Sequence, residues 1–275
     1  MALTAVCSAK RSPGATVTAL AFTLSWARRV ILAECDPAGG DIAAGFLREV
    51  PLADRGLARL GAALRRRRLA EDLWNQLVDL APANGTALTR LVLPGLIEPA
   101  QARTWADQYD SREPSGWEQL AQLFRSLESG TSGYDVIADC GRLTAPYPPT
   151  PLLAAADVVL LVARPDLPSI RAAAVALPGL QRTATGPVGL VLVGDGAYSS
   201  AECAAQLHVP VVATLPHDPG AAAVLSNGGE HHRGRLLRAA ARAEAPVWRL
   251  VTAGRAAGDE RAAAQVEARG VRSVG

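Results

Sequence analysis

A short polar loop follows the first apolar run of the chain, and its residues are suited to binding phosphate. Gly14 and Thr16 close the loop, and a helical run begins directly after them. Backbone N–H groups at the start of a helix carry the positive end of the helix dipole, so they attract anions. Glycine lets the backbone approach such an anion closely, and a threonine hydroxyl at this position can ligate Mg²⁺. The loop therefore predicts a phosphate-binding site.

The loop lacks a cation that phosphate-binding loops of this kind carry. Their pattern is G-x-x-x-x-G-K-[ST], and Ala15 occupies the lysine position between the glycine and the threonine. A hydrogen bond to a charged group is worth roughly 1.5–3 kcal/mol, so this loss weakens the hold on phosphate. Pro13 removes one further N–H donor. We expect weak nucleotide binding, slow hydrolysis or neither, unless Lys10 or Arg11 replaces the missing charge.

Two aspartates follow later apolar runs that have the character of buried strands. Asp36 comes after Val30–Ala33, and Asp139 comes after Val136–Ala138. Neither run alternates with polar residues, which is typical of parallel strands covered on both faces. Right-handed crossovers bring the carboxyl ends of such strands to one edge, so both carboxylates are expected near the phosphate loop. The alternative is a turn without a ligand, in which each carboxylate simply caps a helix.

Seven apolar runs alternate with helical patterns, which predicts an α/β fold with a doubly wound, mostly parallel sheet and helices on both faces. The leucine spacing over Leu57–Leu80 predicts one helix, and Trp117–Leu127 predicts another. We expect a single domain over residues 1–255 and a flexible tail over residues 256–275. The predicted strands are Leu3–Val6, Val30–Ala33, Leu91–Leu93, Val136–Ala138, Val158–Ala163, Val188–Val193 and Val211–Leu215.

The composition is that of a folded protein from a reducing compartment. Hydrophobic residues make up 49% and charged residues 20% of the 275 residues, which supports a large core and excludes global disorder. The four cysteines form no C-x-x-C pair, so a cytoplasmic location is expected. No apolar run reaches the ~18 residues of a membrane span. Three cysteines follow predicted strands, either as small buried hydrophobes, the commoner case, or as a thiol cluster: Cys7, Cys35 and Cys140.

A run of four arginines is the sharpest charge feature of the chain. It could contact DNA phosphates or an anionic lipid surface. It also lies within a predicted helix beside two acidic residues, and the net charge of the chain is only +2, which favours a solvated helix face. The run consists of Arg65, Arg66, Arg67 and Arg68.

Taken in order, the motifs resemble the MinD/ParA family of deviant Walker A ATPases, the group that includes the Tad-pilus localisation proteins. In the family loop K-G-G-x-G-K-[ST]-T, the first lysine corresponds to Lys10, which is the sole lysine of this chain, and the second corresponds to Ala15. Arg11 and Ser12 replace the two glycines. Further segments resemble the family's acidic turn, its Walker B strand, the segment after it and the adenine-flanking loop: Glu34–Gly39, Tyr134–Gly141, Leu161–Ile170 and Pro210–Asp218.

The resemblance implies a role for each matching residue. Asp139 would hold Mg²⁺ through water and Thr16 would ligate it directly, while Asp36 would orient or deprotonate the attacking water. Lys10 would reach across a homodimer to the partner's phosphates, as an arginine finger does. The residues that would contact ATP or ADP are Lys10, Arg11, Ser12, Pro13, Gly14, Ala15, Thr16, Val17, Pro216, His217 and Asp218.

Three functions are consistent with this sequence. The first is a MinD/ParA-like positioning or scaffolding factor that binds ATP or ADP with Mg²⁺ weakly, or has lost both, and that positions a secretion or pilus machine or the nucleoid. The second is an active ATPase in which Lys10 or Arg11 supplies the missing charge. The third is a protein-interaction module that binds no nucleotide.

Overall fold

The computed structural model describes residues 2–10, 13–52, 55–80, 89–107, 113–127, 133–229 and 234–272. Within these residues, an eight-stranded sheet runs in the order β3-β4-β2-β5-β1-β6-β7-β8. Neighbouring strands pair in parallel, except that β3 and β4 are antiparallel. The strands are β1 Leu3–Ser8, β2 Val30–Glu34, β3 Val78–Asp79, β4 Arg90–Leu93, β5 Asp135–Arg142, β6 Val158–Ala163, β7 Val188–Val193 and β8 Val211–Leu215.

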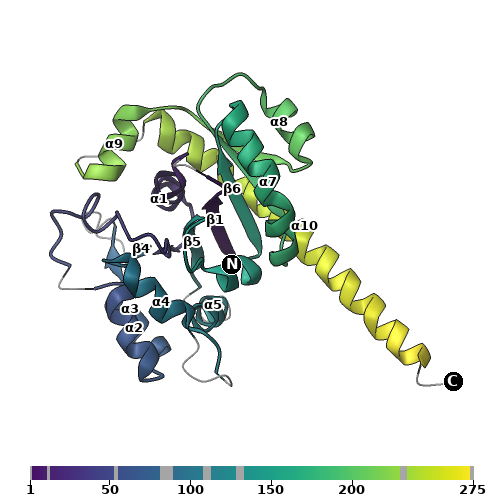
Figure 1. The fold of residues 1–275 in the computed structure, drawn as a ribbon, viewed down its shortest axis with the longest axis horizontal. Coiled ribbons are helices and arrows are strands. Elements are labelled where there is room, and N and C mark those ends of the chain that lie inside the picture. The colour runs from purple at the N-terminus through teal and green to yellow at the C-terminus, as the bar shows by residue number, and fades with distance from the viewer. Residues whose placement is uncertain are drawn as a thin grey trace.

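Helices cover both faces of the sheet, which confirms the predicted fold class (Figure 1). In β1, Leu3 and Cys7 pack into one hydrophobic core and Val6 into the other, so this strand is buried on both sides. Residues of α2 to α8 belong to the first core, and residues of α1, α9 and α10 belong to the second. The helices are α1 Ala15–Ser25, α2 Leu57–Arg65, α3 Leu69–Gln76, the 3₁₀ helix η2 Pro99–Gln101, α4 Ala102–Ala106, α5 Gly116–Ser126, α6 Thr150–Ala155, α7 Leu167–Thr183, α8 Ser200–Leu207, α9 Pro219–Asn227 and α10 Arg235–Arg272.

The central strand β1 lies where the winding of the sheet reverses. It is flanked by β5 and β6. The chain passes from β1 to β2 on one side and later crosses from β5 to β6 on the other. Ligands of open α/β sheets bind outside the carboxyl ends of the strands at such a reversal. The register pairs Val6 of β1 with Asp139 of β5, so the polar loop and this aspartate meet at that point.

The structure corrects the single helix predicted over Leu57–Leu80. Two helices, α2 and α3, are separated by a turn at residues 66–68. Arg67 in this turn has a φ of 56°, a left-handed conformation that interrupts a helix. The leucine spacing continues across the turn because both helices bury leucines in the same core. The spacing alone therefore could not reveal the break.

The four arginines consequently lie at the end of α2 and in the turn after it, and not in the middle of a helix. Arg67 pairs with Glu113, and Arg68 pairs with Glu71 at 2.7 Å. All four side chains are exposed. Exposed ion pairs of this kind contribute little to stability. The two pairs neutralise part of the charge of the run.

The predicted flexible tail over residues 256–275 is helical in the structure as far as Arg272. The C-terminal part of α10 extends away from the sheet (Figure 1). Alanine, arginine, glutamate and glutamine dominate this segment and are strong helix formers, which accounts for the helix. The single domain over residues 1–255 stays a prediction.

Candidate functional site

Gly14 turns the chain from the polar loop into α1. Its φ of 99° and ψ of 38° lie in the left-handed region, which glycine adopts without strain. Among the described residues, no side chain caps the start of α1, and its first turn has no acidic residue. The first N–H groups of the helix are therefore available to an anion, and the helix dipole favours one there.

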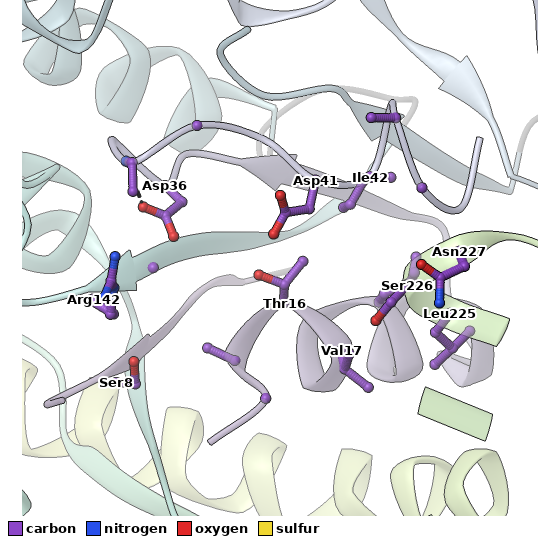
Figure 2. Close-up of a pocket in the computed structure, with 18 residues that line it drawn as sticks. Ser8, Thr16, Val17, Asp36, Asp41, Ile42, Arg142, Leu225, Ser226 and Asn227 are labelled. Carbon is purple, nitrogen blue, oxygen red and sulfur yellow. Dashed lines mark hydrogen bonds between the residues drawn. The ribbon is translucent and has the colours of Figure 1, made fainter. Parts of the chain in front are cut away.

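A cavity of about 790 Å³ lies in front of this helix start (Figure 2). Its walls come from the beginning of α1, the loop after β2, the end of β5 and the end of α9. Thr16 lies near the middle of the cavity, with Asp36 and Asp41 facing it from the loop after β2 (Figure 2). Arg142 lies at one end and Asn227 at the other. We call this the nucleotide-site cavity, after the site that the sequence predicts there.

Asp139 is a buried carboxylate with one unsatisfied oxygen. Its Oδ1 accepts a hydrogen bond from the Gly141 N–H at 3.0 Å, while no described residue donates a hydrogen bond to its Oδ2. Burial raises the pKa of Asp139 to about 6, against the opposing effects of the Thr16 hydroxyl and the Gly141 N–H. A buried oxygen without a partner costs free energy. This oxygen is therefore suited to a cation, or to water bound to a cation.

Asp36 is held directly above the end of β5. Its carboxylate accepts a hydrogen bond from the Ala38 N–H at 2.8 Å. A Cβ atom at Gly141 would collide with this carboxylate, and Gly141 has a φ of 61°, so only glycine fits there. Partial burial raises the pKa of Asp36, while the Ala38 N–H and the positive charge of Arg142 lower it. The acidic turn thus places a second carboxylate close to Asp139.

Glu34 connects the loop after β2 to the loop after β4 by hydrogen bonds. Its Oε1 accepts hydrogen bonds from the N–H groups of Asp41 and Ile42 at 2.7 and 2.9 Å, and its Oε2 accepts one from Gly95 at 2.8 Å. Burial raises the pKa of Glu34 to about 7, although the three N–H groups oppose this shift. The sequence marks Glu34 only as the first acid of its motif, but the structure shows that it holds the loop that carries Asp36.

The structure brings part of the predicted site to the nucleotide-site cavity. Gly14, Ala15, Thr16, Val17 and Asp36 line it. Pro13 is buried, and Arg11 and Ser12 lie outside the described residues.

Lys10 does not line this cavity. It is exposed and borders a second cavity of about 870 Å³, which is formed by α7 and the segment between β5 and α6. The side chain therefore lies outside the site of its own chain.

The segment predicted to contact the base, Pro216–Asp218, also lies outside the nucleotide-site cavity. It follows β8 at the edge of the sheet, where Pro216 borders a third cavity of about 380 Å³. His217 packs beside Gly194, and Asp218 caps α9 by accepting a hydrogen bond from the Ala221 N–H at 3.0 Å. The role of these residues in base binding stays a prediction.

Sequence reasoning missed five polar residues that line the nucleotide-site cavity: Ser8, Asp41, Arg142, Ser226 and Asn227. Arg142 directly follows the segment that resembles the Walker B strand, so its position at the strand end was a usable signal. Asp41 lies two residues beyond Gly39, where the segment that resembles the family's acidic turn ends. Asn227 is distant in sequence and carries no signal of this kind.

The buried cysteines are small apolar side chains at the ends of their strands. Cys7, Cys35 and Cys140 are buried, and burial raises the pKa of all three thiols. A protonated thiol is a poor nucleophile and a poor metal ligand. In the described part of the chain, no three His, Cys, Asp or Glu side chains are grouped to hold a metal ion. Nor does any described helix have the length and apolarity needed to cross a bilayer.

The fold and the cavity define an α/β protein of the P-loop kind, in which an uncapped helix start faces carboxylates from neighbouring strands. Comparison with solved structures makes this class more specific. The structure resembles the cell division protein MinD of Aquifex aeolicus, with a TM-score of 0.66 and 14% identity over 90% of this chain and 97% of that one. It also resembles a ParA family ATPase of Chlorobium tepidum TLS, with a TM-score of 0.62 and 15% identity over 90% and 97%.

A third similar structure is the septum site-determining protein MinD of Pyrococcus horikoshii OT3 complexed with Mg-ADP. Its TM-score is 0.60, with 15% identity over 87% of this chain and 93% of that one. No protein-family model and no curated protein matches the sequence. The protein therefore has the fold of the MinD/ParA ATPases, as the order of its motifs predicted.

Proposed function

We propose that this protein is a MinD/ParA-like positioning or scaffolding factor that binds Mg²⁺ and ATP or ADP in the nucleotide-site cavity. The observation that carries the proposal is the pairing of two open groups. The start of α1 offers N–H groups without a cap, and Asp139 offers a buried oxygen without a partner. The first fits a phosphate and the second fits a cation, so a magnesium-bound phosphate satisfies both.

The residues present fit Mg²⁺. Asp139 and Thr16 would hold it, since this ion is bound in such sites by one or two protein oxygens together with waters and phosphate oxygens. When bound, the ion neutralises phosphate charge. Asp36 and Asp41 add negative charge to the same cavity, so a phosphate without a metal would be repelled. The chain resembles in fold a MinD protein that was solved with Mg-ADP.

Hydrolysis, if it occurs, would be slow. Asp36 is held where it could orient a water molecule, because the Ala38 N–H and the close approach of Gly141 fix its carboxylate. Ala15, however, contributes no charge at the start of α1, and positive charge near the phosphates is a large part of phosphoryl-transfer catalysis. We therefore propose a nucleotide-dependent switch with little turnover.

We further propose that the protein acts in the cytoplasm as a homodimer. Lys10 borders the second cavity and does not line the site of its own chain, which suits a cation that serves a partner's site. All four cysteines are free, as in proteins of reducing compartments. A protein machine is the cargo that we propose. DNA or an anionic surface is a further candidate partner for the exposed Arg65 and Arg66, whereas Arg67 and Arg68 already have acidic partners.

Calorimetric titration with ATP and ADP, each with and without Mg²⁺, tests the proposal. We expect magnesium-dependent binding, in the micromolar to millimolar range because a cation is missing at position 15. No heat and no thermal shift at millimolar nucleotide would overturn it. Steady phosphate release that disappears in Asp36→Ala would instead show an active ATPase.

The second candidate is an interaction module without nucleotide. The observation that favours it is the second cavity, which is lined mainly by apolar groups of α7 and bordered by the exposed side chains of Leu167 and Val175. An exposed apolar hollow of this kind often marks a contact with another protein. A negative titration would leave this candidate as the better one.

A further inference from the structure

Among the described residues, the nucleotide-site cavity has more negative than positive charge. Asp36 and Asp41 line it, and Asp139 lies buried beside it. Ala15 stands where phosphate loops carry their lysine, so the start of α1 offers backbone N–H groups and the Thr16 hydroxyl but no cationic side chain. A polyphosphate bound there would carry charge that one divalent ion neutralises only in part. The cavity therefore needs a further cation if it is to hold such a ligand well.

Arg142 is the cationic side chain that lines this cavity among the described residues. It is the last residue of β5, three positions after Asp139, and it pairs in register with Ser8 at the end of β1. In Figure 2 it lies between Asp36 and Ser8, on the side of the cavity where the chain enters the phosphate loop. Its position follows from the strand, because the carboxyl end of β5 opens directly at the site.

The guanidinium of Arg142 is available for a ligand. The side chain is exposed, and no described carboxylate forms an ion pair with it within 4.0 Å. Its charge nevertheless reaches Asp36, since it lowers the pKa of that carboxyl group. Arginine has a long side chain and presents several N–H donors in a planar fork that matches phosphate oxygens. An arginine without an ion-pair partner can turn toward a phosphate without breaking a salt bridge.

We propose that Arg142 binds a phosphate group of the nucleotide and supplies the positive charge that Ala15 lacks. This inference rests on the proposed function and deepens it. Lys10 is placed differently, because it borders the second cavity. The positive charge at the phosphate would thus come from the end of β5, the Walker B-like strand, and not from the start of α1.

Titration of Mg·ADP and Mg·ATP into wild type, Arg142→Gln and Arg182→Gln tests this inference. Arg182 is the matched control, because it is exposed like Arg142 and lines none of the three cavities. We expect Arg142→Gln to weaken both nucleotides about tenfold or more and to leave adenosine unaffected, since charge-assisted bonds to phosphate are lost. Arg182→Gln should bind like wild type. Equal affinities for wild type and Arg142→Gln would overturn the inference while leaving the proposed function intact.

Two further variants separate a direct phosphate contact from an effect through Asp36. In an Asp36→Asn background, the loss caused by Arg142→Gln should persist, because the phosphate contact does not require Asp36. A loss that vanishes in this background would overturn the inference. Ala15→Lys should restore affinity to Arg142→Gln, since it returns a cation to the site. If wild type itself binds no nucleotide, the proposed function and this inference both fail, which is a different result from the loss of the Arg142 effect alone.

Discussion

The nucleotide-site cavity has two sides that differ in how firmly the protein holds them. On the acidic side, Glu34 binds three backbone N–H groups, and Asp36 is fixed by Ala38 and Gly141. On the loop side, the start of α1 has the open N–H groups of a phosphate site but Ala15 in place of a cation. The acidic side is thus held by hydrogen bonds within the protein, whereas the loop side offers backbone N–H groups without a cation at position 15.

Ala15 in the motif position of lysine thus leaves the hydrogen bonds of the acidic side in place. A buried carboxylate costs free energy when it is ionised, which is why burial raises the pKa of both Glu34 and Asp139. Changes to the acidic side should therefore have clear effects on ligand binding and on stability.

The largest effect is expected from the acidic side. Asp139→Asn removes the negative charge from the buried oxygen that lacks a partner, so magnesium-dependent nucleotide binding should fall about 100-fold or more. Calorimetric titration with Mg·ADP measures this, and circular dichroism verifies the fold. Glu49→Gln, at an exposed carboxylate, is the matched control. Unchanged affinity in Asp139→Asn would show that this buried carboxylate does not support magnesium-dependent binding.

The next effect concerns stability. Glu34→Ala leaves the N–H groups of Asp41, Ile42 and Gly95 without their acceptor, two of them buried. The free energy of unfolding should fall by about 2–4 kcal/mol, since each orphaned buried group costs about 1–3 kcal/mol and the removal of a buried carboxyl returns part of that. Urea denaturation measures the change. Glu49→Ala should alter the free energy by less than about 0.5 kcal/mol. A similar loss in both variants would contradict the role of Glu34.

The smallest effect is a dependence of stability on pH. The folded protein raises the pKa of Glu34 from 4.5 to about 7, so between these values it binds more protons than the unfolded chain. Stability is then highest below the unfolded pKa and falls as the pH rises toward 7, by about 1–3 kcal/mol from this group. Urea denaturation without metal, from pH 4.5 to 7.5, measures the slope. Glu34→Gln should flatten it, and an equal slope in this variant would refute the assignment.

Most of the fold could be predicted because the strands carry continuous apolar runs. All seven predicted strands are present, and only β3 was missed, since two residues show no periodicity. The break between α2 and α3 could not be predicted from the leucine spacing. It depends on one left-handed residue, Arg67, at which neither proline nor glycine marks the turn.

The candidate site was predictable only as far as its motifs extend. Strand order places Asp36 and Asp139 near each other, because Asp36 lies two residues beyond β2 and Asp139 lies in the second half of the neighbouring strand β5, while Thr16 is the second residue of α1. The cavity that Lys10 borders could not be predicted, since a loop residue after β1 can lie on either side of the strand. The lack of an ion-pair partner for Arg142 among the described residues depends on its distance from their carboxylates, which no spacing in the sequence encodes.

The contact between Gly40 and Gly95 has a consequence for how the sequence can vary. A Cβ atom on Gly40 would lie 2.5 Å from Glu34 Oε2 and 2.8 Å from the Gly95 Cα atom, and a Cβ atom on Gly95 would lie equally close to Gly40. The residue types that fit at positions 34, 40 and 95 therefore depend on one another. Substitutions among them should be strongly non-additive, because a shorter acid at position 34 would relieve the contact with Glu34 but not the backbone contact with Gly95 that a side chain at position 40 would make. Evolution can then change this corner of the protein only by coordinated steps.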